Sequence, residues 1–358
     1  MKVRKQHLEN IKRVPNPGGN RLRTVRLDKN ERTIRFSETD WQEMLAPIVK
    51  NPEWITAYPE VKPLIQKIAA WDGVNDDQIF LTAGSDLALK ACFESFVSPG
   101  DKVVLLEPTF AMGNVYCQLF QAQQKAIPCK NDMSYGLNDL IAAVDSDTAF
   151  VYLPNPNSPT GGEFSLSELD QLLAHCQSKS VPVFVDEAYY FFSKTTALPL
   201  VKKYENLVVG RTFSKACGLA GVRLGYAAGQ KEIIDLVGKW RPMYEVNSFA
   251  IQFGTYLIEH PYLIDKYVEK VQAAKEQVMS WCFAKDVPFF KSAANFINVK
   301  VGEANAKEIE KACLENNILL KGGAPYKPGN ECVRISLGVP EQVDLLLPIM
   351  EKVLGISK

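Results

Sequence analysis

The chain contains 358 residues, of which 46% are hydrophobic, which is enough for about two domains of roughly 100–200 residues with sizeable cores. Its 41 Lys and Arg residues balance 41 Asp and Glu residues, so its charge favours neither a nucleic acid nor an anionic membrane as a partner. No stretch approaches the roughly 18 uninterrupted apolar residues of a membrane span, and the polar N-terminus lacks the apolar segment of a signal peptide. The eight cysteines form no CxxC pair, and the three histidines have no second likely ligand beside them. We therefore expect a cytoplasmic protein with reduced thiols and no metal site.

From about residue 60, strand-like and helix-like segments alternate along the chain, which is typical of an α/β fold with a doubly wound, mostly parallel sheet. The predicted strands cover residues 78–82, 102–106, 149–153, 181–186, 207–211 and 225–228. Predicted helices between them include residues 86–97, 167–177 and 231–237. After Pro261 we expect a long amphipathic helix over 262–284, strands at 295–299 and 332–337, and a helix at 306–315 between the two strands. This second pattern predicts a smaller α+β domain.

Lys215 lies in small, apolar and Gly-rich sequence just after a β-branched strand candidate. Burial disfavours the ammonium form of a lysine, so such a residue can act as the neutral amine that attacks a carbonyl and forms a Schiff base. Arg223, eight residues further on, offers a fixed fork of donors suited to a phosphate. A lysine beside a strand is by itself more often a surface residue, so the neighbouring motifs decide this interpretation.

A second chemical motif follows the strand predicted at 181–186. That strand delivers a carboxylate, Asp186, and then a phenol, Tyr189, at its C-terminal end, where open α/β sheets bind ligands. A lysine, a carboxylate and a phosphate-binding arginine are the groups that pyridoxal phosphate needs, because the carboxylate keeps the pyridine nitrogen protonated and the ring then acts as an electron sink. The sequence therefore predicts a pyridoxal-phosphate site with Lys215, Asp186 and Tyr189 as its catalytic residues.

A series of further motifs accompanies these residues in a fixed order. They are Leu27-Asp28-Lys29-Asn30-Glu31, Ala57-Tyr58-Pro59, Gly84-Ser85-Asp86, Glu107-Pro108-Thr109-Phe110, Asn155-Pro156-Asn157-Ser158-Pro159-Thr160-Gly161, Asp186-Glu187-Ala188-Tyr189, the run around Lys215, and Val333-Arg334-Ile335-Ser336. In order and spacing the chain resembles the fold-type I, class I/II aminotransferases, nearest to the histidinol-phosphate aminotransferase group. The resemblance implies a large cofactor-binding domain over residues 45–260, and a small domain formed by residues 1–44 together with 261–358.

The cofactor phosphate is expected at Gly84-Ser85-Asp86, which opens a helix directly after a strand and so presents unpaired backbone N–H groups. The same three residues also read as an ordinary helix cap. The resemblance adds further cofactor-binding residues, which are Thr212, Ser214 and Arg223 at the phosphate, Phe110 on the pyridine face, and Tyr189 at the phenolic oxygen. It also implies a homodimer in which Tyr58 reaches the phosphate of the neighbouring subunit.

On the substrate side, the resemblance assigns Arg334 to the substrate carboxylate through a bidentate contact, with a structural ion pair as the alternative, and places Asn30 in the same pocket.

Several positions depart from the pattern of the histidinol-phosphate group. Ser158, preceded by Asn157, stands where an asparagine normally bonds the ring oxygen, so Asn157 or a backbone adjustment must supply that bond. Asn16 lies in Val14-Pro15-Asn16-Pro17-Gly18, where the group carries Tyr-x-Pro-Gly, and Lys321 replaces a second phosphate-binding arginine. Glu245 stands where an asparagine is common, and a carboxylate there would repel a substrate phosphate. We therefore count Asn16, Lys321 and Glu245 as substrate-side candidates.

These observations predict an aminotransferase that moves an amino group from an amino acid, with glutamate as the expected donor, to a small polar carbonyl acceptor through an internal aldimine at Lys215. The residues that depart from the histidinol-phosphate pattern favour an acceptor other than that of histidine biosynthesis. Phosphorylated carbonyl compounds are among the acceptors that they allow. Three alternatives stay open: histidinol-phosphate transamination itself, decarboxylation of a phosphorylated amino acid such as serine or threonine phosphate, and an inactive binding or regulatory protein of the same fold.

Overall fold

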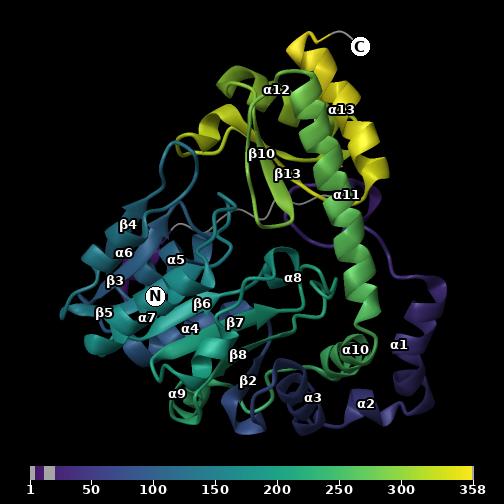
Figure 1. Cartoon of the computed structure of the whole chain (residues 1–358). Coiled ribbons are helices and arrows are strands. Elements are labelled where there is room, and N and C mark those ends of the chain that lie inside the picture. Colours follow the sequence, from purple (N-terminus) through teal and green to yellow (C-terminus); the bar gives the residue numbers. More distant parts are fainter. Residues whose placement is uncertain (1–4, 12–20, 357–358) are drawn as a thin grey trace.

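A seven-stranded mixed sheet forms the centre of the larger part of the molecule (Figure 1). The computed structural model describes residues 5–11 and 21–356. In spatial order the strands are β2 (Ile79–Thr82), β8 (Gly225–Gly229), β7 (Leu207–Thr212), β6 (Val183–Asp186), β5 (Thr148–Pro154), β3 (Lys102–Glu107) and β4 (Gln123–Pro128). Strand β8 runs antiparallel to both of its neighbours, and the other pairs are parallel. The predicted α/β fold with a mostly parallel sheet is thus confirmed.

Six strands of this sheet form within two residues of the bounds that the sequence predicts. Strand β4 was not predicted, because it is an edge strand in which only Ile127 is buried. Its sequence, Gln-Gln-Lys-Ala-Ile-Pro, therefore lacks the apolar pattern of the central strands.

Alternate residues of the central strands face two different cores. On β3, Val104 and Leu106 face one core, whereas Val103 and Leu105 face the other. The first core is covered by α1 (Glu38–Lys50), α3 (Lys62–Asp72), α6 (Leu137–Ala143), α7 (Leu166–Ser178) and α10 (Ser248–Glu259). The second core is covered by α4 (Ser85–Phe96), α5 (Ala111–Leu119) and α9 (Lys231–Val237). Burial on both faces explains why these strands read as continuous apolar runs.

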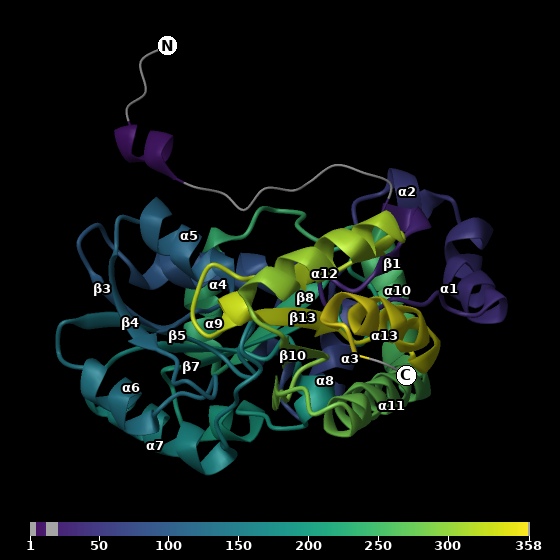
Figure 2. The ribbon, with the colours of Figure 1, turned by 90° about the horizontal axis from the view of Figure 1, so that it is seen from above.

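A smaller α+β part lies over one end of the large sheet (Figure 2). Its antiparallel sheet has the order β12 (Lys321–Gly322), β13 (Cys332–Ser336), β10 (Phe296–Lys300) and β9 (Phe289–Phe290), and β1 (Val25–Arg26) pairs in parallel with β11 (Ile318–Leu319). Its helices are α11 (Tyr262–Ala284), α12 (Glu303–Glu315) and α13 (Pro340–Leu354), and two four-residue helices, α2 (Glu53–Thr56) and α8 (Tyr190–Ser193), lie elsewhere in the chain.

Helix α11 connects the two parts of the molecule. Its first turn buries Leu263 and Ile264 in the core of the large sheet, whereas Val271 and Val278 belong to the core of the smaller part. Leu27 lies in that smaller core too, so the N-terminal segment packs with the C-terminal elements. The division into residues 45–260 and 1–44 plus 261–358 remains our proposal, and its first boundary falls inside α1.

All eight cysteines are unpaired. Among residues 5–11 and 21–356, no helix is both long and apolar enough to cross a bilayer.

Candidate active site

The ends of four strands of the large sheet align at one edge. Asp186 at the end of β6 lies beside Pro154 of β5 and Gly210 of β7. Thr212 of β7 and Thr82 of β2 both lie opposite Gly225 of β8. Residues that follow these strands are therefore brought together at the C-terminal edge of the sheet, which is where open α/β sheets bind ligands.

The predicted phosphate residues form one cluster around the first turn of α4. Gly84 precedes the helix with φ of +90°, and a Cβ atom at this position would lie 2.4 Å from Nη2 of Arg223. Nη1 of Arg223 donates to Oγ of Ser214 at 3.3 Å, and the hydroxyl of Thr212 donates to the same Oγ at 3.0 Å. No carboxylate lies within ion-pair distance of Arg223 in the described part of the chain. The guanidinium, two hydroxyls and the helix N-terminus together suit a phosphate.

Asp186 provides a buried carboxylate at the neighbouring position. Its Oδ2 accepts a hydrogen bond from the hydroxyl of Tyr152 at 3.2 Å, and its Oδ1 accepts the backbone N–H of Ala188 at 3.2 Å. Burial raises the pKa of Asp186 to about 6, although these two hydrogen bonds act in the opposite direction. A buried carboxylate of this kind suits the protonated ring nitrogen of pyridoxal phosphate, because the ring would bring the missing positive charge.

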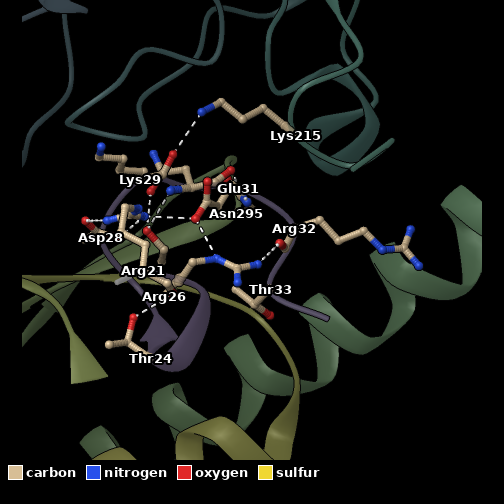
Figure 3. Close-up of polar contacts among 12 residues, drawn as sticks. Arg21, Thr24, Arg26, Asp28, Lys29, Glu31, Arg32, Thr33, Lys215 and Asn295 are labelled. Atoms are coloured by element: carbon tan, nitrogen blue, oxygen red, sulfur yellow. Dashed lines mark hydrogen bonds and ion pairs between the residues drawn. The ribbon is translucent and has the colours of Figure 1, made fainter. Parts of the chain in front are cut away.

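Lys215 reaches from the end of β7 toward the N-terminal segment (Figure 3). The side chain is half-buried, and its Nζ donates a hydrogen bond to the carbonyl oxygen of Lys29 at 2.9 Å. The same Nζ lies 5.8 Å from the ring centre of Tyr189. The acceptor of this hydrogen bond is thus a neutral carbonyl group.

The N-terminal segment is fixed beside Lys215 by several contacts. Arg21 makes two hydrogen bonds to the carboxylate of Asp28 (Figure 3). Burial would raise the pKa of Asp28, but the hydrogen bonds and charge of Arg21 outweigh it and hold that pKa below its ordinary value. Asn30 donates from Nδ2 to the hydroxyl of Tyr189 at 2.9 Å, and its own backbone N–H donates to Oγ of Ser336 at 3.0 Å. Asn30 and Tyr189, which were predicted separately, therefore form one hydrogen-bonded pair.

Arg334 and Lys321 lie side by side on the smaller sheet. Lys321 of β12 and Asn298 of β10 both stand opposite Arg334 of β13, so the three side chains share one face. That face points toward the large domain, because Asn298 donates to the carbonyl oxygen of Pro159 at 3.0 Å. Nη2 of Arg334 donates to the carbonyl oxygen of Asp28 at 2.7 Å, and its Nε is buried without a partner among the described residues. An anion is the natural partner for such a guanidinium.

Asn157 is held by hydrogen bonds within the protein, and its contact with the cofactor ring remains a proposal. Its amide nitrogen donates to the carbonyl oxygen of Pro108 at 2.9 Å and to the hydroxyls of Tyr135 at 2.9 Å and Thr160 at 3.0 Å. Its oxygen accepts the hydroxyl of Thr109 at 3.0 Å. The fully buried side chain therefore ties its loop to the segment after β3 and to Tyr135. Ser158, at the position that aligns with the usual asparagine, is also buried.

The other predicted site residues that the structure describes, Phe110, Tyr58 and Glu245, do not form one cluster with each other. Phe110 is 42% exposed at the start of α5, and Tyr58 is 73% exposed with its ring stacked on Tyr244 at 4.0 Å. Glu245 accepts the backbone N–H of Ala83 at 3.1 Å, immediately before Gly84. Asn16 lies outside the described residues.

A buried ionic network behind the site was not predicted. Nη1 of Arg211 bonds Asp72 at 2.7 Å, and its Nη2 bonds Glu187 at 3.0 Å, while the hydroxyl of Tyr226 donates to Asp72 at 2.7 Å. Glu187 follows Asp186, and Arg211 precedes Thr212, so the network fixes the strand ends that carry the site. The sequence offered one signal of this network, the charged Arg211 inside the apolar strand β7. Arg211 and Asp72 also line a cavity of about 700 Å³, which none of the predicted cofactor residues lines.

A buried carboxylate, a lysine and an arginine beside a helix N-terminus, set at one edge of a mixed α/β sheet, define a pyridoxal-phosphate-dependent enzyme of fold type I. Sequence comparison then identifies the group within this class. A sequence model of the family "Aminotransferase class I and II" matches residues 55–348. The chain belongs to this family and is a pyridoxal-phosphate-dependent aminotransferase, as the sequence motifs predicted.

The relatives agree with this assignment. The chain is 31% identical over 339 residues to histidinol-phosphate aminotransferase 2 of Haemophilus influenzae, which covers 93% of this chain and 90% of that protein. Among solved structures, the pyridoxal-phosphate complex of histidinol-phosphate aminotransferase from Sinorhizobium meliloti is similar with a TM-score of 0.83, 22% identity, and coverage of 92% and 91%. L-Threonine-O-3-phosphate decarboxylase from Porphyromonas gingivalis has a TM-score of 0.77, 23% identity, and coverage of 92% and 99%. At these identities the two structures show a shared fold alone.

Proposed function

We propose that this aminotransferase uses glutamate as its amino donor, and that histidinol phosphate and its keto counterpart are its other substrate pair. One observation carries the catalytic part of the proposal. Arg334 and Lys215 donate hydrogen bonds to the consecutive carbonyl groups of Asp28 and Lys29. A side chain suited to hold a substrate anion therefore lies next to the amine that would act on the substrate.

The residues divide the chemistry among them. Pyridoxal phosphate, when bound, would supply the carbonyl carbon for Lys215 and an electron sink for the electron pair that remains when the substrate α-carbon loses its proton. Arg223, Ser214, Thr212 and the α4 N-terminus would hold its phosphate, and Asp186 would hold the proton on its ring nitrogen. Nζ of Lys215 would then carry the proton that leaves the substrate α-carbon, and Tyr189 with Asn30 would orient the ring oxygen.

The substrate pair follows from Arg334, Lys321 and the relatives. Arg334 suits the carboxylate of glutamate in one half-reaction and a substrate phosphate in the other, and Lys321 adds a second positive charge on the same face. The departures in sequence had favoured a different acceptor. The structure weakens one reason for that expectation, because Glu245 is bonded to Ala83 beside the predicted cofactor-phosphate turn. The similarity to enzymes named for histidinol phosphate supports the proposed pair.

We further propose that the active unit is a cytoplasmic homodimer. Exposed apolar side chains gather around the Tyr58–Tyr244 stack: Ile55 is 65% exposed and Met243 is 85% exposed. A second subunit covering this surface would bury it and would bring Tyr58 to the neighbouring site.

The test is a pair of half-reactions followed spectroscopically. Glutamate alone should convert the visible band of the cofactor-loaded enzyme to the pyridoxamine form, and 2-oxoglutarate should restore it. Histidinol phosphate should produce the same conversion. A band that responds to glutamate but not to histidinol phosphate would leave the aminotransferase intact and restore the prediction of another acceptor. Release of carbon dioxide from threonine phosphate without a response to glutamate would instead favour the decarboxylase alternative.

A further inference from the structure

Glu245 lies against the predicted phosphate site from outside the motifs that define it. Its Oε1 accepts the backbone N–H of Ala83 at 3.1 Å, immediately before Gly84 and the first turn of α4. Two residues later, Nδ2 of Asn247 donates to the carbonyl oxygen of Val222 at 3.0 Å, immediately before Arg223. The Glu245 segment is therefore attached to both chain segments that supply phosphate-binding groups.

The second carboxyl oxygen of Glu245 is left without a partner. Oε2 is shielded from solvent, and no hydrogen-bond donor contacts it within residues 5–11 and 21–356. A buried, unpaired carboxylate oxygen costs free energy, so a proton or an incoming donor at this atom would be stabilising.

Two cations act on the carboxyl group of Glu245. Burial raises the pKa of Glu245, while the Ala83 N–H and the charges of Arg241 and of Lys90 on α4 partly offset this effect. These cations favour the ionised carboxylate as long as the phosphate site holds no anion.

A phosphate at the α4 N-terminus and Arg223 changes this balance. It adds roughly two negative charges close to the carboxylate, and like charges at short range raise the pKa of a carboxyl group. A protonated carboxyl group also becomes a hydrogen-bond donor, so it can bond a phosphate oxygen in place of repelling it.

We propose that Glu245 takes up a proton when the phosphate group of the cofactor binds, so that cofactor affinity falls as the pH rises. The inference rests on the assignment of Gly84, Ser85 and Arg223 to the cofactor phosphate. Glu245 then has a positioning role in cofactor binding. Because a protonated carboxyl group does not repel the phosphate, a glutamate can lie next to a phosphate-binding site.

The experiment measures proton uptake and affinity together. Pyridoxamine 5'-phosphate is titrated calorimetrically into the cofactor-free enzyme in buffers of different ionisation enthalpy between pH 6 and 8.5. This probe forms no covalent bond to Lys215, so the titration of that lysine does not contribute through imine formation. Wild type is compared with Glu245→Gln, which keeps an acceptor for the Ala83 N–H, with Glu245→Ala as a second variant, and with Glu269→Gln on the exposed surface of α11 as a matched control.

The expected result is that wild type and the Glu269→Gln control take up about half a proton or more in excess of both Glu245 variants. Glu245→Gln should bind the probe at least about tenfold more tightly than wild type at pH 8.5, with the difference shrinking toward pH 6, since one pKa unit of coupling corresponds to a tenfold change. Equal proton uptake in wild type and both Glu245 variants would overturn the inference while leaving the cofactor site standing. Failure of the wild-type enzyme to bind the probe at any pH would overturn the site assignment itself.

Discussion

Among the residues that the structure describes, Lys215 donates its hydrogen bond to the carbonyl oxygen of Lys29 and not to a carboxylate. A neutral acceptor neither fixes the proton on the amine as strongly as a carboxylate would nor blocks its departure. The lysine is thus kept close to the substrate side without a strong ion pair. At the scale of the single residue, the backbone carbonyl of Lys29 in the N-terminal segment positions the amine of Lys215.

Replacing this lysine gives the first prediction. Lys215→Ala should lower turnover at least about a thousandfold, because its Nζ is the group that we propose to carry the proton from the substrate α-carbon. The variant should still bind pyridoxal phosphate through its phosphate, but borohydride should no longer attach the cofactor to the protein, as mass spectrometry of the intact chain would show. Lys239→Ala, on an exposed lysine, is the control. Retention of normal turnover by Lys215→Ala would contradict the central assignment.

Asp186 gives a prediction about the stability of the cofactor-free protein. Its folded-state pKa of about 6 lies above the ordinary value of 3.8, so the folded protein binds this proton more tightly than the unfolded chain does. Its contribution to stability is therefore greatest below about pH 4 and is lost as the pH rises through about 6, by about 3 kcal/mol at most.

Urea unfolding of wild type and Asp186→Asn at pH 4 to 7 tests this point. The stability of the variant relative to wild type should rise across that range, whereas Asp147→Asn, at an exposed carboxylate, should show no such trend. A pH-independent difference between Asp186→Asn and wild type would show that burial does not raise the pKa of Asp186 as described.

At the scale of elements, the antiparallel strand β8 sets the shape of the phosphate site. It enters between β2 and β7, and Gly225 at its start lies opposite both Thr82 and Thr212. A Cβ atom at Gly225 would lie 2.3 Å from the backbone nitrogen of Ser85 and 2.6 Å from the carbonyl carbon of Gly84. Because the backbone at Gly225 packs directly against Gly84 and Ser85, the first turn of α4 and Arg223 lie next to each other.

Gly225→Ala should therefore displace the first turn of α4 and weaken cofactor binding at least about tenfold, because the clash involves backbone atoms that cannot rotate away. The dissociation constant for pyridoxal phosphate, measured by quenching of protein fluorescence, reports this change. Gly221→Ala is the matched control, since a Cβ atom there meets nothing within 4 Å. Equal affinities of the two variants would indicate that α4 adapts to the added methyl group.

At the scale of the whole molecule, the two parts cooperate through the site. The residues that we propose to bind the cofactor come mostly from the large sheet and α4, whereas the proposed substrate residues Arg334, Lys321 and Asn30 come from the smaller part and the N-terminal segment. Helix α11 belongs to both cores. Relative movement of the two parts would change the distance between the substrate anion and the reacting amine.

A mixing experiment tests the shared sites of the proposed dimer. Lys215→Ala and Tyr58→Ala subunits, each with low activity alone, should recover about a quarter of wild-type activity when unfolded and refolded together in equal amounts. Half of the dimers would then be mixed, and each mixed dimer would hold one site with an intact Lys215 and an intact Tyr58 from its partner. Light scattering should give a mass near twice the 40.0 kDa of the chain. No recovery on mixing would mean that Tyr58 acts within its own subunit or not at all.

The sequence by itself determined the α/β class, six of the seven strands of the large sheet, and the family with its cofactor. It did so because buried parallel strands are continuous apolar runs, because a lysine, a carboxylate and an arginine are the groups that pyridoxal phosphate needs, and because the ordered motifs resemble those of one family. Only the tertiary structure decided which groups meet. The bonds of Asn157 to Pro108 and Thr109, the Asn30–Tyr189 bond, the Arg211 network and the attachment of Glu245 to Ala83 all join segments far apart in the chain. Such contacts depend on strand register and on the packing of one part against the other, and no local pattern of residues encodes either.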